Sequence, residues 1–208
     1  MNRRCCPLLL CVLAGYCLPA HAGNLTLRED NVTHAISVYR EGEAKPILTQ
    51  NAGADFRPYI HPIVAPDGRG VVTEFSPSHH RHQTGLYWGF TKLNGRDYFH
   101  NPDNGYWRRV SSRPIVAAGG EVKWNTVYHL LDAAGQPAML ETQLWTMRDT
   151  GDRYLLELEW TGEALTNITI GEYAYGGLFL RMPWRAGMEG SAVNNARQSN
   201  ERANGQRA

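Results

Sequence analysis

Cysteine is missing from almost the whole chain, because its four cysteines all lie within the first 17 residues. That segment has the form of a secretory signal. It has a basic start at Arg3 and Arg4, an apolar run over 7–17 and a small-x-small cleavage site at 20–22. Cleavage would leave a protein without a thiol, and therefore without a disulfide or a thiolate metal site. We expect residues 1–22 to be a signal peptide and the protein to be periplasmic or secreted.

Long apolar runs and an excess of charge of one sign are also missing after residue 22. A membrane-spanning helix needs roughly 18 apolar residues or more, so we expect no membrane span. Without Arg3 and Arg4 the net charge is close to zero. This excludes a basic field of the kind that binds nucleic acid or an anionic membrane surface. The partner we expect is a small-molecule or glycan substrate.

The sequence also lacks sustained helical periodicity. Instead it contains short stretches in which apolar and polar residues alternate. The clearest are 121–131 and 153–160, with an earlier example at 34–39 and turn residues at 133–137 and 149–152. Crossover helices are missing, so parallel βαβ units are excluded, and strands joined by such turns indicate an antiparallel meander. We predict an all-β fold, an antiparallel β-sandwich over residues 23–185. The side chains expected on inward faces are Ile36, Val38, Val122, Trp124, Tyr128, Leu130, Tyr154, Leu156, Leu158 and Trp160.

Three local patterns add detail to this prediction. The segment 57–64 contains two prolines, which cannot donate to a ladder, so we expect an edge strand or an extended crossing segment. The Asn-Gly pair at 94–95 predicts a hairpin turn with a strand on either side. Two consecutive glycines at 176–177 predict a bulge or the close approach of another backbone or a ligand.

The last residues, 186–208, differ in character from the rest. They contain no aromatic residue and many Asn, Gln, Gly and Arg. A compact sandwich rarely ends on a long loop with no element after it. We therefore expect a polar loop at the point of a C-terminal truncation, with closing strands in the missing part.

Three histidines within four positions, His79, His80 and His82, form the least ordinary stretch of the sequence. If this stretch is extended, His80 and His82 project to the same face. Two imidazoles at this spacing can share a divalent metal ion, and a third ligand would leave an open position of the catalytic kind. Nitrogen and oxygen ligands suit zinc, iron(II), copper or manganese. The candidates for the third ligand are His61, His100 and Glu74, and the working set is His80, His82 and His61.

Histidines also act without a metal, because imidazole is the usual general acid or base near neutral pH and needs only a partner carboxylate. Glu74 and Glu172 flank the histidine stretch and the glycine pair. We take His80, His82, Glu74 and Glu172 as the candidate catalytic residues. The ordinary alternative is that the histidines are packed loop residues and the carboxylates solvated strand ends.

Four further side chains are candidates for substrate binding. Arg57 and His61 lie in the proline-stiffened segment, where a guanidinium could grip a carboxylate or paired hydroxyls. Trp88 could stack on the apolar face of a sugar, and Arg181 follows the glycine pair. For each of them an ordinary ion pair or a core position is the alternative.

Three motifs of the sequence form a recognisable set. They are Arg57-Pro-Tyr-x-His-Pro-x-x-x-Pro-x-Gly68, Ser78-His-His-Arg-His-x-x-Gly-Leu86 and Tyr175-Gly-Gly-Leu-x-x-Arg181. Taken together they resemble an uncharacterised family of exported bacterial proteins labelled "methane oxygenase PmoA-like". The resemblance covers most of residues 24–185, and members continue past the position of Ala208. The family has Asp-His-x-His-His where this chain has Ser-His-His-Arg-His.

The resemblance implies sugar-related neighbouring genes. It also implies a sandwich similar to the large one of galactose mutarotases, where a His and a Glu act on a pyranose. The activity in the label is excluded, because a membrane methane monooxygenase subunit needs several spanning helices. Our leading hypothesis is an exported protein that binds a carbohydrate or acts on it by acid–base chemistry, such as epimerisation or glycoside cleavage. The alternatives are a His-ligated metal-dependent oxygenase or hydrolase, and a non-catalytic carbohydrate-binding module.

Overall fold

The computed structural model describes residues 24–118 and 120–184, which form two antiparallel sheets and no helix. This confirms the predicted all-β sandwich class. Within these residues, no helix is long and apolar enough to cross a membrane. The predicted signal peptide, the polar loop at 186–208 and the predicted truncation point lie outside the described residues.

The first sheet contains six strands in the order β1-β2-β3-β4-β5-β10, with each neighbouring pair antiparallel. Its strands are short, and its last member comes from a distant part of the sequence. The strands are β1 (Leu25–Glu29), β2 (Ile36–Arg40), β3 (Leu48–Asn51), β4 (Tyr59–Ile63), β5 (Leu86–Gly89) and β10 (Gly177–Leu180).

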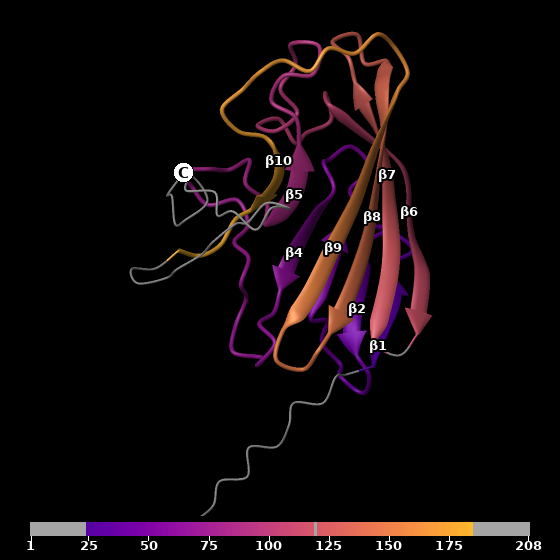
Figure 1. The fold of residues 1–208 in the computed structure, drawn as a ribbon, viewed down its shortest axis with the longest axis vertical. Coiled ribbons are helices and arrows are strands. Elements are labelled where there is room, and N and C mark those ends of the chain that lie inside the picture. The colour runs from indigo at the N-terminus through magenta and orange to yellow at the C-terminus, as the bar shows by residue number, and fades with distance from the viewer. Residues whose placement is uncertain (1–23, 119, 185–208) are drawn as a thin grey trace, which may run out of the picture.

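The second sheet is a four-stranded meander in sequence order, as predicted from the alternating stretches. Its long strands stand side by side in Figure 1, with β4, β5 and β10 on the other side of the molecule. The strands are β6 (Trp107–Ala118), β7 (Glu121–Leu131), β8 (Pro137–Asp149) and β9 (Tyr154–Ala164).

The core fills the space between the sheets. Ile36 and Val38 of β2, and the predicted inward-facing residues of β7, have no exposed surface. The Trp124 and Trp145 rings stack on neighbouring strands, with centroids 6.4 Å apart. Full burial of each large apolar side chain contributes roughly 1.5–3 kcal/mol. On β9 the predicted inward residues are partly buried, and Glu157 and Glu159 between them are exposed, so the predicted faces are confirmed.

The two sheets contact each other near both ends of the six-stranded sheet. Strand β1 contacts β6 and β7. At the other end Trp88 of β5 stacks on Trp160 of β9, with centroids 5.1 Å apart and planes inclined by 23°. This stacked pair closes the sandwich next to β10, beside which the candidate site is built.

Strand β4 corrects the prediction for 57–64, because it is an interior strand between β3 and β5. The register with β3 is irregular opposite the proline of β4, which cannot donate to the ladder. Side chains bond to the backbone groups there. Asn51 Nδ2 donates to the His61 carbonyl at 2.6 Å, and the Ile63 amide donates to Thr73 Oγ1 at 3.0 Å.

The Asn-Gly pair at 94–95 forms the predicted turn, but the predicted second strand is wrong. The two residues have φ values of 50° and 75°, as a type I′ turn requires. The flanking Leu93 and Arg96 exchange two backbone hydrogen bonds of 3.0 Å. The chain then turns again at 98–100, because the Asp97 carboxylate accepts hydrogen bonds from two amides of this turn, at 3.0 and 2.9 Å.

Candidate functional site

The three histidines lie in a closed loop, residues 75–84, which we call the histidine loop. Its first and last residues form an antiparallel bridge. Inside it the His80 amide donates to the Pro77 carbonyl at 2.9 Å, and the Gln83 amide donates to the His80 carbonyl at 3.0 Å. Two turns therefore follow each other. The expected extended conformation, in which His80 and His82 share one strand face, is wrong.

Gly85 joins the histidine loop to β5 and requires glycine for two reasons. Its φ is +90°, which L side chains rarely adopt, and a Cβ there would lie 2.4 Å from the Ile60 carbonyl oxygen. The exit of the loop is thus pressed directly against β4. A side chain at this position would have to push the loop away from the sheet.

Arg57 fixes the histidine loop through a hydrogen bond from the protein interior. It has no exposed surface, and its guanidinium lies over the Tyr87 ring, 3.5 Å from the centroid. One terminal nitrogen donates to the His82 carbonyl at 2.6 Å, and the other donates to the Phe99 carbonyl. Burial lowers the pKa of Arg57 to about 10, so it stays charged at neutral pH. In this arrangement its guanidinium has no surface open to solvent and bonds to backbone carbonyls.

The fold adds a fourth histidine to the three of the loop. The ring centroids are 4.9 Å apart between His79 and His80, 5.9 Å between His80 and His82, and 4.6 Å between His82 and His100. Burial, followed by the charges of His100 and Arg57, lowers the pKa of His82 to about 4. The His82 imidazole is therefore neutral at neutral pH. Within the described part of the chain, the buried Nδ1 of His80 has no hydrogen-bond partner.

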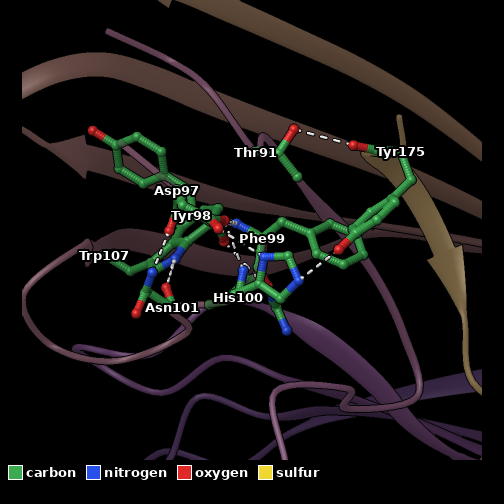
Figure 2. A network of polar contacts seen from close by, with 9 residues as sticks. Thr91, Asp97, Tyr98, Phe99, His100, Asn101, Trp107 and Tyr175 are labelled. Carbon is green, nitrogen blue, oxygen red and sulfur yellow. Dashed lines mark hydrogen bonds and ion pairs between the residues drawn. The ribbon is translucent and has the colours of Figure 1, made fainter. Parts of the chain in front are cut away.

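His100 lies at the centre of a triad of Asp97, His100 and Tyr175 (Figure 2), which we call the Asp–His–Tyr triad. Asp97 Oδ2 lies 2.7 Å from His100 Nδ1, and the Tyr175 hydroxyl lies 3.1 Å from His100 Nε2. An ionised carboxylate only accepts hydrogen bonds, so it places the imidazole proton on Nδ1. Nε2 is then free to accept from the tyrosine hydroxyl. The geometry is that of an oriented imidazole with a proton donor in front of it.

The tyrosine end of the triad opens to the surface. Tyr175 is 51% exposed, and Thr91 Oγ1 donates to its backbone carbonyl at 3.0 Å (Figure 2). Partial desolvation, followed by a hydrogen bond with Tyr173, raises the pKa of Tyr175 above its ordinary value. Tyr175 therefore keeps its proton at neutral pH, as a donor to His100 requires.

A pocket of about 310 Å³ adjoins Tyr175. This size lies at the lower end of the ~300–1,000 Å³ of small-molecule sites. Tyr173 and Tyr175 stand edge to face at its rim, with centroids 5.0 Å apart. Gly177, with φ +86°, lies beside Trp88, whose ring would be at an ordinary contact distance of 3.5 Å from a Cβ there. The positive φ therefore accounts for this glycine, and the close approach of another backbone or a ligand stays a prediction. The lining residues are Phe90, Thr91, Lys92, Ile170, Gly171, Tyr173, Tyr175, Gly176 and Gly177.

Arg181 and Glu74 lie at the His79 end of the four neighbouring imidazoles. Arg181 Nε donates to Glu74 Oε2 at 2.7 Å, and one terminal nitrogen lies 3.1 Å from His79 Nε2. The second terminal nitrogen donates to Gln83 Oε1 at 3.1 Å. The two candidates are thus partners of each other. Together they clamp the outer side of the histidine loop to the chain that leaves β10.

The working metal set of His80, His82 and His61 is not assembled. His61 lies on β4, where its Nδ1 is 2.9 Å from Thr73 Oγ1 and burial lowers its pKa. Within residues 24–118 and 120–184, no group of three His, Cys, Asp or Glu side chains is arranged to hold a metal ion. His61 packs against Phe75 at the start of the histidine loop, with centroids 5.6 Å apart.

Neither Trp88 nor Glu172 is among the described residues that line the pocket. Trp88 is partly buried and stacks on Trp160, so one of its faces is covered by protein. Glu172 is exposed on the segment between Gly171 and Tyr173. Tyr173 and Tyr175, which follow Glu172 in the sequence, are the exposed aromatic residues that line the pocket.

Sequence patterns alone assigned no role to two members of the triad and indicated the third only as a metal candidate. His100 was a possible third ligand, Tyr175 was part of a motif, and Asp97 was not singled out. The signal that could have found Asp97 is the Asp-x-x-His spacing directly after the Asn-Gly turn, because an Asp in a tight turn bonds to amides two and three residues on.

The chain was compared with known families, curated proteins and solved structures. A model of a family of unknown function, DUF6807, matches residues 36–208. The chain belongs to this family. No curated protein and no solved structure matches the chain. Membership of DUF6807 assigns no activity, so the case for a function depends on the geometry of the site.

Proposed function

We propose that the protein is an exported carbohydrate-active protein that binds a sugar in the pocket beside β10 and acts on it through the Asp–His–Tyr triad. The observation that carries this proposal is the hydrogen-bonded sequence from Asp97 through His100 to Tyr175, an exposed residue that lines the pocket. The resemblance to an exported bacterial family with sugar-related gene neighbours agrees with this substrate class.

The triad suits proton transfer at a hydroxyl-bearing or anomeric carbon. Asp97 orients the imidazole and stabilises it when it gains a proton, as the carboxylate of a His–Asp pair does in hydrolases. His100 would accept the Tyr175 proton while the tyrosine oxygen takes one from the substrate. In reverse the same pair donates a proton. A positioned acid–base group contributes roughly 10²–10⁴-fold to a rate.

The surroundings of the triad suit a sugar as the ligand. Exposed tyrosine rings stack on the C–H faces of pyranoses because the body of the ring is apolar and carries a polar hydroxyl at its tip. Tyr173 and Tyr175, with exposures of 46% and 51%, stand at the pocket mouth. In this proposal His82, neutral and in ring contact with His100, is a positioning residue. Of the earlier catalytic candidates, Glu74 belongs to the Arg181 clamp.

The test combines binding and turnover on the purified protein. Calorimetric titration with a panel of mono- and oligosaccharides measures binding. NMR of the anomeric protons detects epimerisation, and release of reducing ends detects glycoside cleavage. His100→Ala is expected to abolish turnover. His129→Ala is the matched control, because His129 lies on β7 in the four-stranded sheet, and it should behave as wild type.

Two results would overturn the proposal. If no sugar in the panel binds, the substrate class is wrong. If sugar binds and His100→Ala leaves binding and any turnover unchanged, the triad is not the acting group. Binding without turnover that depends on Tyr173 and Tyr175 alone would assign a non-catalytic carbohydrate-binding module.

A further inference from the structure

Among the described residues that line the pocket, Lys92 is the only one with a charged side chain. It lies next to Thr91, which holds the backbone of Tyr175. Its ammonium stands over the Tyr173 ring, 5.3 Å from the centroid. The charge therefore lies close to one of the two tyrosine rings that we propose as the stacking surface for the sugar.

The backbone and stem of Lys92 are fitted to this place. The Gly171 amide donates to the Lys92 carbonyl at 2.8 Å. A Cβ on Gly171 would lie 3.1 Å from the Lys92 Cβ and 3.2 Å from its Cδ. Such contacts are tighter than ordinary van der Waals contacts, so a larger residue at 171 would displace the lysine stem. The glycine leaves room for the lysine side chain along the pocket wall.

The charge of Lys92 is not neutralised by a neighbouring acid. Among the described residues, no carboxylate lies within ion-pair distance of its ammonium. Asp97, the carboxylate of the adjacent triad, already accepts from His100 Nδ1 and from two backbone amides. A cation facing a pocket without its own counterion favours an anionic ligand there.

We propose that the sugar bound in this pocket carries an anionic group, which pairs with Lys92 while the ring lies against Tyr173 and Tyr175. This inference rests on the proposed function and specifies its substrate class. Lysine recognises carboxylate, sulfate and phosphate alike as a point charge. The shared chemistry is therefore an acidic or acid-substituted sugar, and the three anions become separate arms of the test.

The experiment compares ligands that differ only in charge. D-Glucuronate and D-glucuronamide are nearly isosteric, and glucose 6-sulfate and glucose 6-phosphate are compared with glucose. Dissociation constants are measured by NMR titration at low and high salt. We expect the anion of at least one pair to bind roughly tenfold more tightly than its neutral partner, as one charge-assisted hydrogen bond supplies. The preference should shrink at high salt, because an exposed charge is screened.

Lys92→Met keeps the apolar stem and removes the charge, and it should abolish the preference for the anion without weakening the neutral ligand. Lys45→Met is the control, because Lys45 is an exposed loop lysine between β2 and β3. Circular dichroism confirms that both variants fold.

Equal affinity for the charged and neutral partners in every pair would overturn the inference and leave the proposed function standing. So would an anion preference that survives Lys92→Met. Failure of every sugar to bind, charged or neutral, would instead overturn the proposed function and this inference with it.

Discussion

The four-stranded sheet and the β5–β10 end of the six-stranded sheet are stabilised in different ways. Strands β6 to β9 are 11 to 13 residues long and present buried tryptophans to the core. The strands β5 and β10 are four residues long, and the loops around them are held by single polar side chains such as Arg57 and Asp97. Stabilisation by burial is distributed over many contacts in the four-stranded sheet. At the β5–β10 end, each polar side chain that holds a loop (a polar tie) acts alone.

The difference indicates that the four-stranded sheet contributes most of the stability, whereas the β5–β10 end carries the candidate site. A change in the meander should cost global stability and leave the geometry of the site intact in the folded fraction. A change in a polar tie should cost less stability and alter the site specifically. The predictions below separate these outcomes, from the largest effect to the smallest.

Replacement of Trp124 by Ala should give the largest loss of stability. The side chain has no exposed surface and stacks on Trp145, and removal of a buried aromatic ring typically costs about 3–5 kcal/mol. Urea unfolding followed by fluorescence measures the loss. Val110→Ala, at a side chain 51% exposed on β6, is the control and should change stability by less than about 0.5 kcal/mol. Similar losses in the two variants would contradict the proposed distribution of burial.

Replacement of Arg57 by Met should cost less stability and disturb the site more. The carbonyls of His82 and Phe99 would lose a buried donor, at about 1–3 kcal/mol. The histidine loop would then move relative to His100. Urea unfolding gives the first quantity, and the imidazole NMR signals of His82 and His100 report the second. Unchanged imidazole signals would show that Arg57 does not position the loop.

Replacement of Glu141 by Gln should change mainly the pH dependence of stability. Burial raises the pKa of Glu141 from its ordinary value of 4.5 to about 7. The folded state thus holds this proton where the unfolded state loses it. The stabilising contribution of the protonated form is complete below about pH 4.5 and is lost as the pH rises through about 7. The free energy of unfolding of Glu141→Gln, relative to wild type, should therefore rise between these values.

His82 contributes a pH dependence of stability with the opposite sign, and this contribution is the same in wild type and in Glu141→Gln. Its pKa is lowered from 6.5 to about 4, so its contribution is present above pH 6.5 and is lost as the pH falls towards 4. Because this slope cancels in the difference between wild type and Glu141→Gln, the difference isolates Glu141. A pH-independent difference would mean that Glu141 is charged in the folded protein across this range.

The sequence predicts the meander well because its signal is local. Alternation places Val122, Trp124 and Leu130 on one face without reference to any other strand. The same alternation puts Glu141 inward on β8, where Trp160 Nε1 donates to it at 2.9 Å. Only the neighbours that the fold supplies explain why a carboxyl group is tolerated there.

The site is largely unpredictable because its parts meet only in three dimensions. Asp97 and His100 form a local pair, but Tyr175 reaches them from the distant segment before β10. The proline in β4 led to the wrong prediction of an edge strand. Side chains form hydrogen bonds with the backbone groups next to it, and no local sequence pattern indicates this. Two turns inside the histidine loop likewise replaced the extended conformation on which the face-sharing prediction depended.

The most direct test of the central claim is an NMR titration of the ¹⁵N-labelled protein with the tightest-binding sugar of the panel. The account predicts that His100 is protonated on Nδ1 in the free protein, and that its imidazole signals and the Tyr175 ring signals shift together on binding. His129 should stay unchanged. Saturable binding that leaves His100 and Tyr175 unshifted, or a His100 protonated on Nε2 alone, would contradict the account.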